Sequence, residues 1–303
     1  MAGHKVGFFH NGRRDSFQEH HEAFLGGLHG LVEKGSVEII DSWGGGETRA
    51  QALQEPIGRL AESGVHVIVA AGGPPSAVAA KEATKQKQIP VVFMSVADPV
   101  GLGLVKSLES PGTNMTGIAG LTSELDEARL DLLRSIVAKG KLPARIGVLN
   151  NRNRPNLDKQ YETLAAAAER WGLNLVRADV SGPDEIKEAF RLFESKIDAV
   201  LVTADSHFND HRAEIVGLAR GLPAIYQWRE FVTAGGLMSF GPNVFEAYRL
   251  VGEYAGRILR GESPSTLQVA LPSRFELVIN LRLAYEQGFR IPALLLTQAE
   301  IIQ

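Results

Sequence analysis

The chain has 303 residues, of which 44% are hydrophobic and 22% charged, values typical of a globular protein with about two domains. Its formal net charge of −3, from 32 basic and 35 acidic residues, excludes a general basic field that would attract nucleic acid. The absence of cysteine excludes disulfides, zinc–thiolate and iron–sulfur sites and a thiol nucleophile, and every apolar run is far shorter than the ~20 residues of a membrane span.

The first part of the chain alternates between short apolar runs and helical periodicity. Strands are predicted at 5–9, 37–43, 65–71 and 89–96, and helices at 16–34, 47–63 and 77–86. Gly-rich or Pro-rich turns, GGG at 44–46 and GGPPS at 72–76, follow the second and third strands. Apolar strands separated by helices are typical of a parallel sheet that is buried on both faces.

A second series with the same outline begins near residue 124. Helices are predicted at 124–138, 156–172, 183–196 and 208–221, and strands at 144–151, 173–180, 197–205 and 222–228. Because the two series match, the sequence predicts an α/β fold of two similar doubly wound lobes, each built on a mostly parallel sheet.

The last sixty residues complicate a simple division into two halves. An amphipathic helix at 245–261 is followed by an extended segment, and a strand with a short helix is predicted at 275–288. If the helix packs on the first lobe and the last strand joins the second, three crossovers fall near 117–121, 241–245 and 268–273. We therefore expect an N-terminal lobe of residues 1–119 plus 244–270, a C-terminal lobe of residues 120–243 plus 271–303, and a ligand cleft between them.

No recognisable motif for catalysis or for a phosphate-bearing cofactor is present. The GLG at 101–103 lacks the spacing of a dinucleotide loop, and neither a G-x-x-x-x-G-K-[ST] nor a G-x-S-x-G motif occurs. Ser76 follows GGPP at a helix start, a place that favours a helix cap or a ligand contact over a nucleophile. No catalytic residue and no cofactor are expected.

The eight histidines do not form an obvious metal site. His207 and His211 are four residues apart and lie close in sequence to Asp205 and Asp210, a combination that could suggest a metal. We interpret these side chains as groups at the surface or the mouth of the cleft, and no metal is expected.

Polar and aromatic side chains recur directly after the predicted strands, where open α/β sheets bind their ligands. They include hydrogen-bond donors, a few charges and aromatic faces, but no catalytic unit. The predicted ligand-binding residues are Phe9, His10, Asn11, Gly73, Pro74, Ser76, Ser95, Asp98, Asn150, Arg152, Asn156, Asp205, His207, Trp228, Arg229 and Asn243.

One long stretch carries a family resemblance. IPVVFMSVADPVGLGLVKSLESPGTNMTGI, at 89–118, resembles the segment from IPVV through DPVGxGLVxSLxxPGxNxTG in substrate-binding proteins of ABC transporters. RIGVLNNRNRPN, GGLMSFGPN and FELVINLRLAYEQGFRIPALLL resemble later segments of the same family, in the same order. The relevant group is the one that includes tryptophan- and tyrosine-binding members.

The resemblance implies a type I periplasmic-binding-protein-like fold with two lobes and three crossovers. It implies a solute-binding component of an ABC importer that closes on a small organic ligand by hinge motion and then meets a membrane permease. It also implies a periplasmic or extracytoplasmic mature protein whose leader is absent from this sequence, and we expect a monomer. A sensor module of the same fold remains an alternative, and an α/β enzyme is a further one.

The resemblance also suggests roles for some matched positions. The loop from Gly73 to Ser76 corresponds to a place where helix-start amides and a hydroxyl hold a ligand carboxylate, and Asp205 to a position that meets an amino group. Asn243 stands where amino-acid-binding relatives have an acid, and Arg229 adds a positive charge. The ligand therefore stays open between an amino-acid-like molecule and an aromatic or other small carboxylate.

Overall fold

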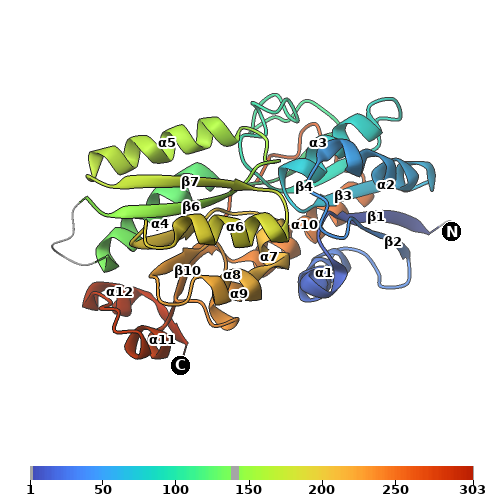
Figure 1. Cartoon of the computed structure of the whole chain (residues 1–303). Coiled ribbons are helices and arrows are strands. Elements are labelled where there is room, and N and C mark those ends of the chain that lie inside the picture. Colours follow the sequence, from blue (N-terminus) through green and yellow to red (C-terminus); the bar gives the residue numbers. More distant parts are fainter. Residues whose placement is uncertain (1–2, 138–142, 303) are drawn as a thin grey trace. The chain divides into compact units, whose positions relative to one another are not determined.

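The computed structural model describes residues 3–137 and 143–302. The chain divides into two compact units, Met1–Leu121 with Asn243–Ser273 and Thr122–Pro242 with Arg274–Gln303, here called unit 1 and unit 2. The chain therefore passes from one unit to the other three times, and Figure 1 shows the elements of both.

Unit 1 is built on a five-stranded parallel sheet in the order β2-β1-β3-β4-β5. Its strands are β1 (His4–His10), β2 (Val37–Trp43), β3 (Val67–Ala71), β4 (Val91–Val96) and β5 (Met115–Ala119). The first four were predicted, whereas β5 lies where the sequence had indicated a crossover. Gly117 permits this last pairing, because a Cβ at that position would lie 2.0 Å from the Phe93 carbonyl oxygen.

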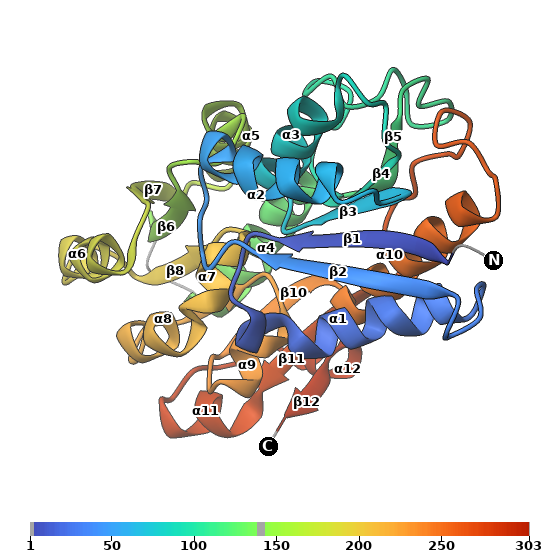
Figure 2. The same ribbon diagram turned by 90° about the vertical axis from the view of Figure 1, so that its right-hand side faces the viewer.

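Four helices cover the two faces of this sheet, as Figure 2 shows. They are α1 (Arg14–His29), α2 (Ala50–Glu62), α3 (Pro74–Thr84) and α10 (Val244–Leu259). Successive residues of a strand face opposite ways, so Phe9 joins the core under α2 and α3, whereas the Phe8 ring packs against Phe24 of α1. Helix α1 ends at His29, several residues before the predicted end at 34.

Helices α1 and α10 approach each other closely, and glycines make the contact possible. A Cβ at Gly27 of α1 would lie 1.8 Å from the Arg249 carbonyl oxygen, and one at Gly252 of α10 would lie 2.1 Å from that of Phe24. Neither position can therefore carry a side chain without separating the helices. This packing is the means by which a helix from late in the chain becomes part of unit 1.

We predict that Gly27→Ala lowers the free energy of unfolding by about 3 kcal/mol, because the added methyl group overpacks a backbone contact. The matched control is Gly26→Ala in the same helix, where a Cβ meets no atom within 4 Å. That change should raise stability by about 0.5–1 kcal/mol through helix propensity. Urea unfolding followed by circular dichroism measures both, and equal effects of the two changes would contradict the packing argument.

Unit 2 contains a seven-stranded sheet in the order β12-β11-β10-β9-β8-β6-β7. Its strands are β6 (Arg145–Asn151), β7 (Asn174–Val180), β8 (Ala199–Val202), β9 (Ala224–Tyr226), β10 (Met238–Pro242), β11 (Phe275–Asn280) and β12 (Glu300–Ile302). Strand β11 runs antiparallel to β10, and the other pairs are parallel. The predicted α/β architecture with mostly parallel sheets is confirmed.

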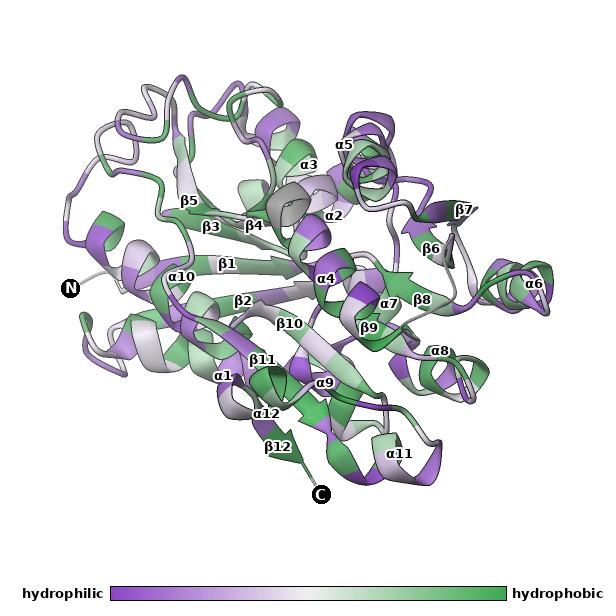
Figure 3. Cartoon of the chain, turned by 90° about the vertical axis from the view of Figure 1, so that its left-hand side faces the viewer, coloured by the Kyte–Doolittle hydropathy of each residue, from purple (hydrophilic) through white to green (hydrophobic). Residues whose placement is uncertain are grey.

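Most helices of unit 2 are shorter than the sequence suggested, and they are more numerous. They are α4 (Thr122–Ile136), α5 (Leu157–Arg170), α6 (Pro183–Phe193), α7 (Ser206–Asp210), α8 (Arg212–Leu218), α9 (Arg229–Thr233), α11 (Leu281–Glu286) and α12 (Ala293–Gln298). The prediction of one continuous helix at 208–221 is wrong. Two helices, α7 and α8, lie there and are separated at His211, whose φ of −108° is not helical. Amphipathic helices such as α6 and α8 carry both colours in Figure 3.

Each face of the second sheet has its own core. Leu130 and Leu133 of α4 and Leu164 of α5 pack together with residues of α11 and α12 on one side. On the other side, Phe190 of α6 and Phe231 of α9 belong to a separate cluster. Burial on both faces explains why β8 is a continuous apolar run.

Within residues 3–137 and 143–302, no helix has the length and apolar character needed to cross a membrane.

Candidate functional site

Parallel pairing determines where the candidate residues of unit 1 lie. Strands β1, β3 and β4 are neighbours in the sheet and parallel, so their carboxyl ends lie at one edge. Asn11, the loop starting at Gly72, and Ser95 are therefore brought to the same edge. The carbonyl oxygen of Ser95 lies 3.9 Å from the position that a Cβ on Gly73 would occupy.

Asn11 packs against two glycines, Gly44 and Gly72, and it fits there because neither has a side chain. A Cβ on Gly72, which has a φ of +93°, would lie 1.9 Å from Asn11 Oδ1, and one on Gly44 would lie 2.9 Å from Asn11 Cα. The Gly44 N–H donates to the His10 carbonyl (2.7 Å) and the Gly46 N–H to that of Asn11 (2.8 Å). The GGG segment thus continues the pairing of β1 and β2 beyond the sheet.

Helix α3 begins at this edge in an unusual way. Gly73 precedes it with a φ of +80°, and the first two helical residues are Pro74 and Pro75. Prolines at these positions are tolerated, but they remove two of the N–H groups that a helix start normally offers to an anion. The hydroxyl of Ser76 is fully buried and has no hydrogen-bond partner among the described residues.

Ser95 and Asp98 both adopt left-handed backbone conformations, with φ of +53° and +50°. Ser95 lies at an irregularity where the register between β4 and β5 shifts. Asp98 Oδ1 accepts a hydrogen bond from the Gly101 N–H (2.8 Å) and so closes the turn after β4. This side chain organises its own loop, which explains the acid without requiring a ligand.

His10, at the end of β1, lies in an aromatic cluster. Its ring is 4.0 Å from that of Phe17 and 5.6 Å from that of Trp43. Nδ1 accepts the Gly12 N–H (2.8 Å), so the neutral ring carries its proton on Nε2. Burial, together with the nearby charges of His20 and His21, lowers the pKa of His10 from 6.5 to about 3.

Two other predicted residues of unit 1 have clear structural roles. Phe9 is fully buried in the core under α2 and α3. Asn243 caps α10, because its Oδ1 accepts the Glu246 N–H at 2.9 Å. Neither environment depends on a bound molecule.

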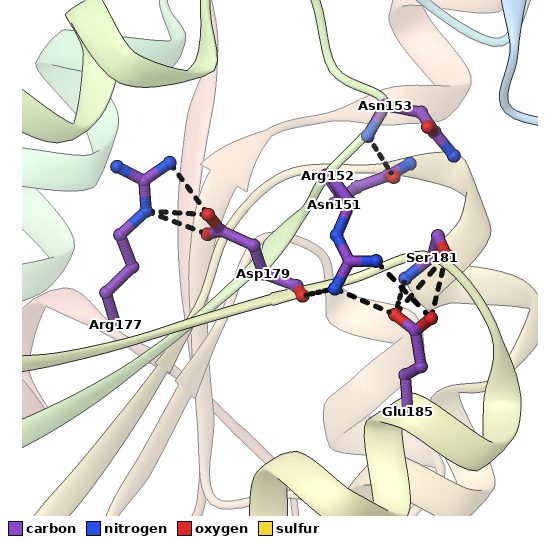
Figure 4. A network of polar contacts seen from close by, with 7 residues as sticks. All are labelled: Asn151, Arg152, Asn153, Arg177, Asp179, Ser181 and Glu185. Carbon is purple, nitrogen blue, oxygen red and sulfur yellow. Dashed lines mark hydrogen bonds and ion pairs between the residues drawn. The ribbon is translucent and has the colours of Figure 1, made fainter.

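The carboxyl edge of unit 2 follows from the same geometry, since β6, β8 and β9 are parallel neighbours. Asn150 donates from Nδ2 to Asp179 Oδ1 on the adjacent strand (3.2 Å). The Arg152 side chain is more than half exposed and turns toward α6, where it pairs with Glu185 (3.2 Å) and donates to the Asp179 carbonyl (2.8 Å), as Figure 4 shows. Arg152 is thus engaged on the surface of its own unit.

Three other predicted residues lie at or near the starts of helices α5 and α7. Asp205 precedes α7, and its Oδ1 accepts the His207 N–H at 2.9 Å. His207 is buried, and its ring lies 4.8 Å from that of His211. Asn156 precedes α5 in a left-handed conformation (φ +61°), and its side chain makes no capping bond.

Trp228 and Arg229 lie at the start of α9, directly after β9. Trp228 is the residue before the helix, and Arg229 is its first residue. The Arg229 guanidinium pairs with Glu300 of β12 (2.6 Å) and with Glu276 of β11 (3.5 Å). These ion pairs connect the end of the chain to the middle of unit 2, so Arg229 has a structural partner for its charge.

Several buried polar groups at the edge of unit 2 were absent from the predicted site. Asn151, Asn209 and Gln227 are each essentially inaccessible. Asn151 Nδ2, both polar side-chain atoms of Asn209 and Gln227 Oε1 lack a hydrogen-bond partner among the described residues. Buried polar groups without partners are rare in proteins, and they are expected where a ligand completes the hydrogen bonding.

Two arginines are also buried in unit 2. Arg129 of α4 is fully buried; it donates to Asp126 Oδ1 (2.6 Å) and to the Phe240 carbonyl (2.7 Å). Arg154, in the turn before α5, is 6% exposed. The sequence alone does not predict that Arg154 is buried and Arg152 exposed, because the conformation of the turn after β6 determines the direction of each side chain.

Across the part of the chain that the structure describes, no group of three or more His, Asp or Glu residues is arranged to hold a metal ion.

Comparisons with known proteins agree with this geometry. A family model described as ABC transporter substrate binding protein matches residues 15–302. A tyrosine-binding protein from Clostridioides difficile is 31% identical over 208 residues, which are 68% of this chain and 58% of that relative. The matched region is thus little more than half of the relative's length.

Solved structures are similar over nearly the whole chain. A conserved domain protein from Vibrio cholerae has a TM-score of 0.88 and 26% identity, covering 99% of both chains. An ABC domain from Streptococcus pneumoniae, solved in complex with L-Trp, has a TM-score of 0.86 and 25% identity, covering 98% of this chain and 100% of that one.

Two α/β units with mostly parallel sheets and three crossovers define the type I periplasmic-binding-protein-like class. The chain belongs to the ABC transporter substrate-binding protein family. This membership agrees with the resemblance seen in the sequence.

We predict that His10 makes stability depend on pH. A histidine whose pKa falls from 6.5 to about 3 on folding contributes stability that is complete above pH 6.5 and is lost as the pH falls toward 3. Over this range the free energy of unfolding falls by about 1.4 kcal/mol per pH unit. Urea unfolding should therefore show that His10→Phe gains about 2 kcal/mol relative to the unmodified protein between pH 7 and pH 5. Parallel pH profiles for the two proteins would contradict this prediction.

Proposed function

We propose that this chain captures one small organic molecule for import and delivers it to a membrane permease. The observation that carries the proposal is the set of fully buried polar groups without partners at the carboxyl edge of unit 2, within a substrate-binding family member. Such groups are costly when unsatisfied, and a polar ligand would satisfy them.

The ligand-binding residues form the second part of the proposal. Asn11, Ser76 and Ser95 would contribute from the edge of unit 1, and Asn151, Asn209 and Gln227 from the edge of unit 2.

Ligand binding would shift the protein toward a closed arrangement of the two units, with a hinge in the crossovers near residues 121, 242 and 273. Small-angle X-ray scattering should then record a smaller radius of gyration with ligand than without it.

The class of ligand follows from the chemistry at the two edges. Relatives bind tyrosine or tryptophan according to their descriptions, and an aromatic amino acid or aromatic carboxylate is the corresponding expectation here. Asp205 is engaged as the cap of α7, and Asn243, the cap of α10, is an uncharged amide, so neither position offers an unengaged carboxylate to a ligand ammonium group. The lack of such a carboxylate favours a ligand that has a carboxylate but no amino group over an α-amino acid.

Transport is favoured over catalysis because the site has donors and acceptors without a nucleophile–base pair. The chain would act outside the cytoplasm as a monomer and require no cofactor. A sensor role would use the same ligand chemistry and differs only in the membrane partner. Steady chemical turnover of a ligand by the purified protein would contradict the transport proposal.

The decisive experiment is to denature the purified protein and identify any released small molecule by mass spectrometry. Calorimetric titration with aromatic amino acids, aromatic carboxylates and the released molecule then measures binding. We expect a saturable one-to-one complex with at least one of them. Complete absence of binding across this panel, together with no released molecule, would contradict the proposed function.

We further predict that Ser76→Ala weakens ligand binding about tenfold, which is the loss of one buried hydrogen bond of about 1.4 kcal/mol. Ser63→Ala is the matched control, since Ser63 is exposed at the end of α2 and its hydroxyl donates to the Leu60 carbonyl. The control should bind like the unmodified protein. Equal affinities for both variants would exclude Ser76 from the site.

A further inference from the structure

Arg154 is a buried arginine whose guanidinium has no partner among the described residues. Only 6% of the residue is exposed, and no hydrogen bond or ion pair engages its guanidinium within the described residues. Arg152 of the same turn and Arg129 of α4 differ, since Arg152 pairs with Glu185 and Arg129 with Asp126. Leaving a charge buried and unpaired is strongly unfavourable unless something else neutralises it.

The surroundings of Arg154 add positive charge. Burial lowers the pKa of Arg129, the Asp126 carboxylate opposes that change, and the nearby charge of Arg154 lowers the pKa further. Two guanidinium groups therefore lie close enough to repel each other, and Asp126 is engaged by Arg129 at 2.6 Å. This region of unit 2 has an excess of positive charge that an anion would balance.

Asn151 supplies a second donor in the same turn. The Arg154 N–H donates to the Asn151 carbonyl (3.1 Å), so residues 151–154 form a β-turn with these two residues at its ends. Asn151 Oδ1 accepts the Asn153 N–H (3.0 Å), which leaves the amide Nδ2 as the donor without a partner (Figure 4). Asn151 Nδ2 is fully buried and the Arg154 residue is 6% exposed, so both ends of the turn carry donors without a partner among the described residues.

The start of α5 adds to this donor set. The helix begins at Leu157, three residues after Arg154, and it has fourteen residues. Asn156 makes no side-chain cap, so it does not occupy the first N–H groups of the helix. The positive end of a helix dipole stabilises an anion nearby.

We propose that Arg154 and Asn151 hold an oxyanion of the ligand, so that the molecule this protein binds is anionic. This inference rests on the proposed function and specifies its ligand class. The Arg154 guanidinium would bind the two oxygens side by side, and Asn151 Nδ2 would donate to one of them. Helix α3 is the less suitable anion site, because Pro74 and Pro75 offer no N–H groups.

Calorimetric titration with matched pairs of probes tests the inference. The pairs are 3-indoleacetate with 3-indoleacetamide, benzoate with benzamide, and L-tryptophan with L-tryptophanamide, together with any molecule that the protein releases. The unmodified protein should bind a carboxylate at least tenfold more tightly than its amide. Inorganic phosphate distinguishes the two anion sources: competition by phosphate alone would assign the site to a phosphate-bearing ligand, and competition by carboxylates alone to a carboxylic acid.

Arg154→Gln should weaken binding of the anionic ligand roughly 100-fold, through loss of two charge-assisted hydrogen bonds. It should also remove the preference for carboxylate over amide. Arg154→Lys keeps the charge and should recover part of the affinity, without the bidentate geometry. The matched control, Arg152→Gln, removes an exposed arginine from the same turn and should bind within twofold of the unmodified protein.

Stability of the ligand-free protein gives an independent readout. Because Arg154 is only 6% exposed and its guanidinium has no partner among the described residues, Arg154→Met should raise the melting temperature while abolishing the preference for carboxylates. A lowered melting temperature with unchanged binding would show a purely structural role and overturn the inference. Binding of the probes or the released molecule with the same preference in Arg154→Gln would overturn it while leaving the proposed function intact. Failure of the unmodified protein to bind any probe would instead count against the proposed function itself.

Discussion

The parallel pairing of neighbouring strands is the constraint on which the rest of this structure depends. Parallel strands need a crossover helix between them, and they place all their carboxyl ends at one edge of the sheet. In unit 1 this brings the ends of β1, β3 and β4 together, and in unit 2 those of β6, β8 and β9. Side chains from segments far apart in the sequence are thereby gathered on short loops with rigid supports.

The two edges differ in how their polar groups are satisfied. In unit 1, Asp98 and Asn243 bond to nearby N–H groups and so organise the loops around them. In unit 2, Asn151, Asn209 and Gln227 keep buried atoms without partners in the described structure. The first kind of group fixes the shape of the backbone, and the second kind is available for recognition. A substrate-binding protein needs both, because a ligand can be discriminated only by groups that are already held in place.

Much of the fold could be predicted from the sequence, because buried strands are apolar and the helices between them are amphipathic. β2 matched its predicted bounds at both ends, whereas β5 was missed, since a short strand with a Gly at its centre resembles a loop. The candidate site was harder to predict, because position after a strand does not reveal whether a side chain turns inward or outward. Arg152 and Arg154 are two residues apart in one turn, and only the folded turn distinguishes the exposed one from the buried one.

The packing of α10 on α1 has a consequence for biosynthesis. The face of the first sheet that includes Phe8 is covered by both helices, yet α1 ends at residue 29 and α10 begins at residue 244. At a ribosomal rate of about 5–20 residues per second, roughly 10–40 s pass between the synthesis of the two helices. During that time unit 1 cannot complete its core. In the nascent chain this face of the sheet therefore lacks the cover of α10 until residues 244–259 have been made.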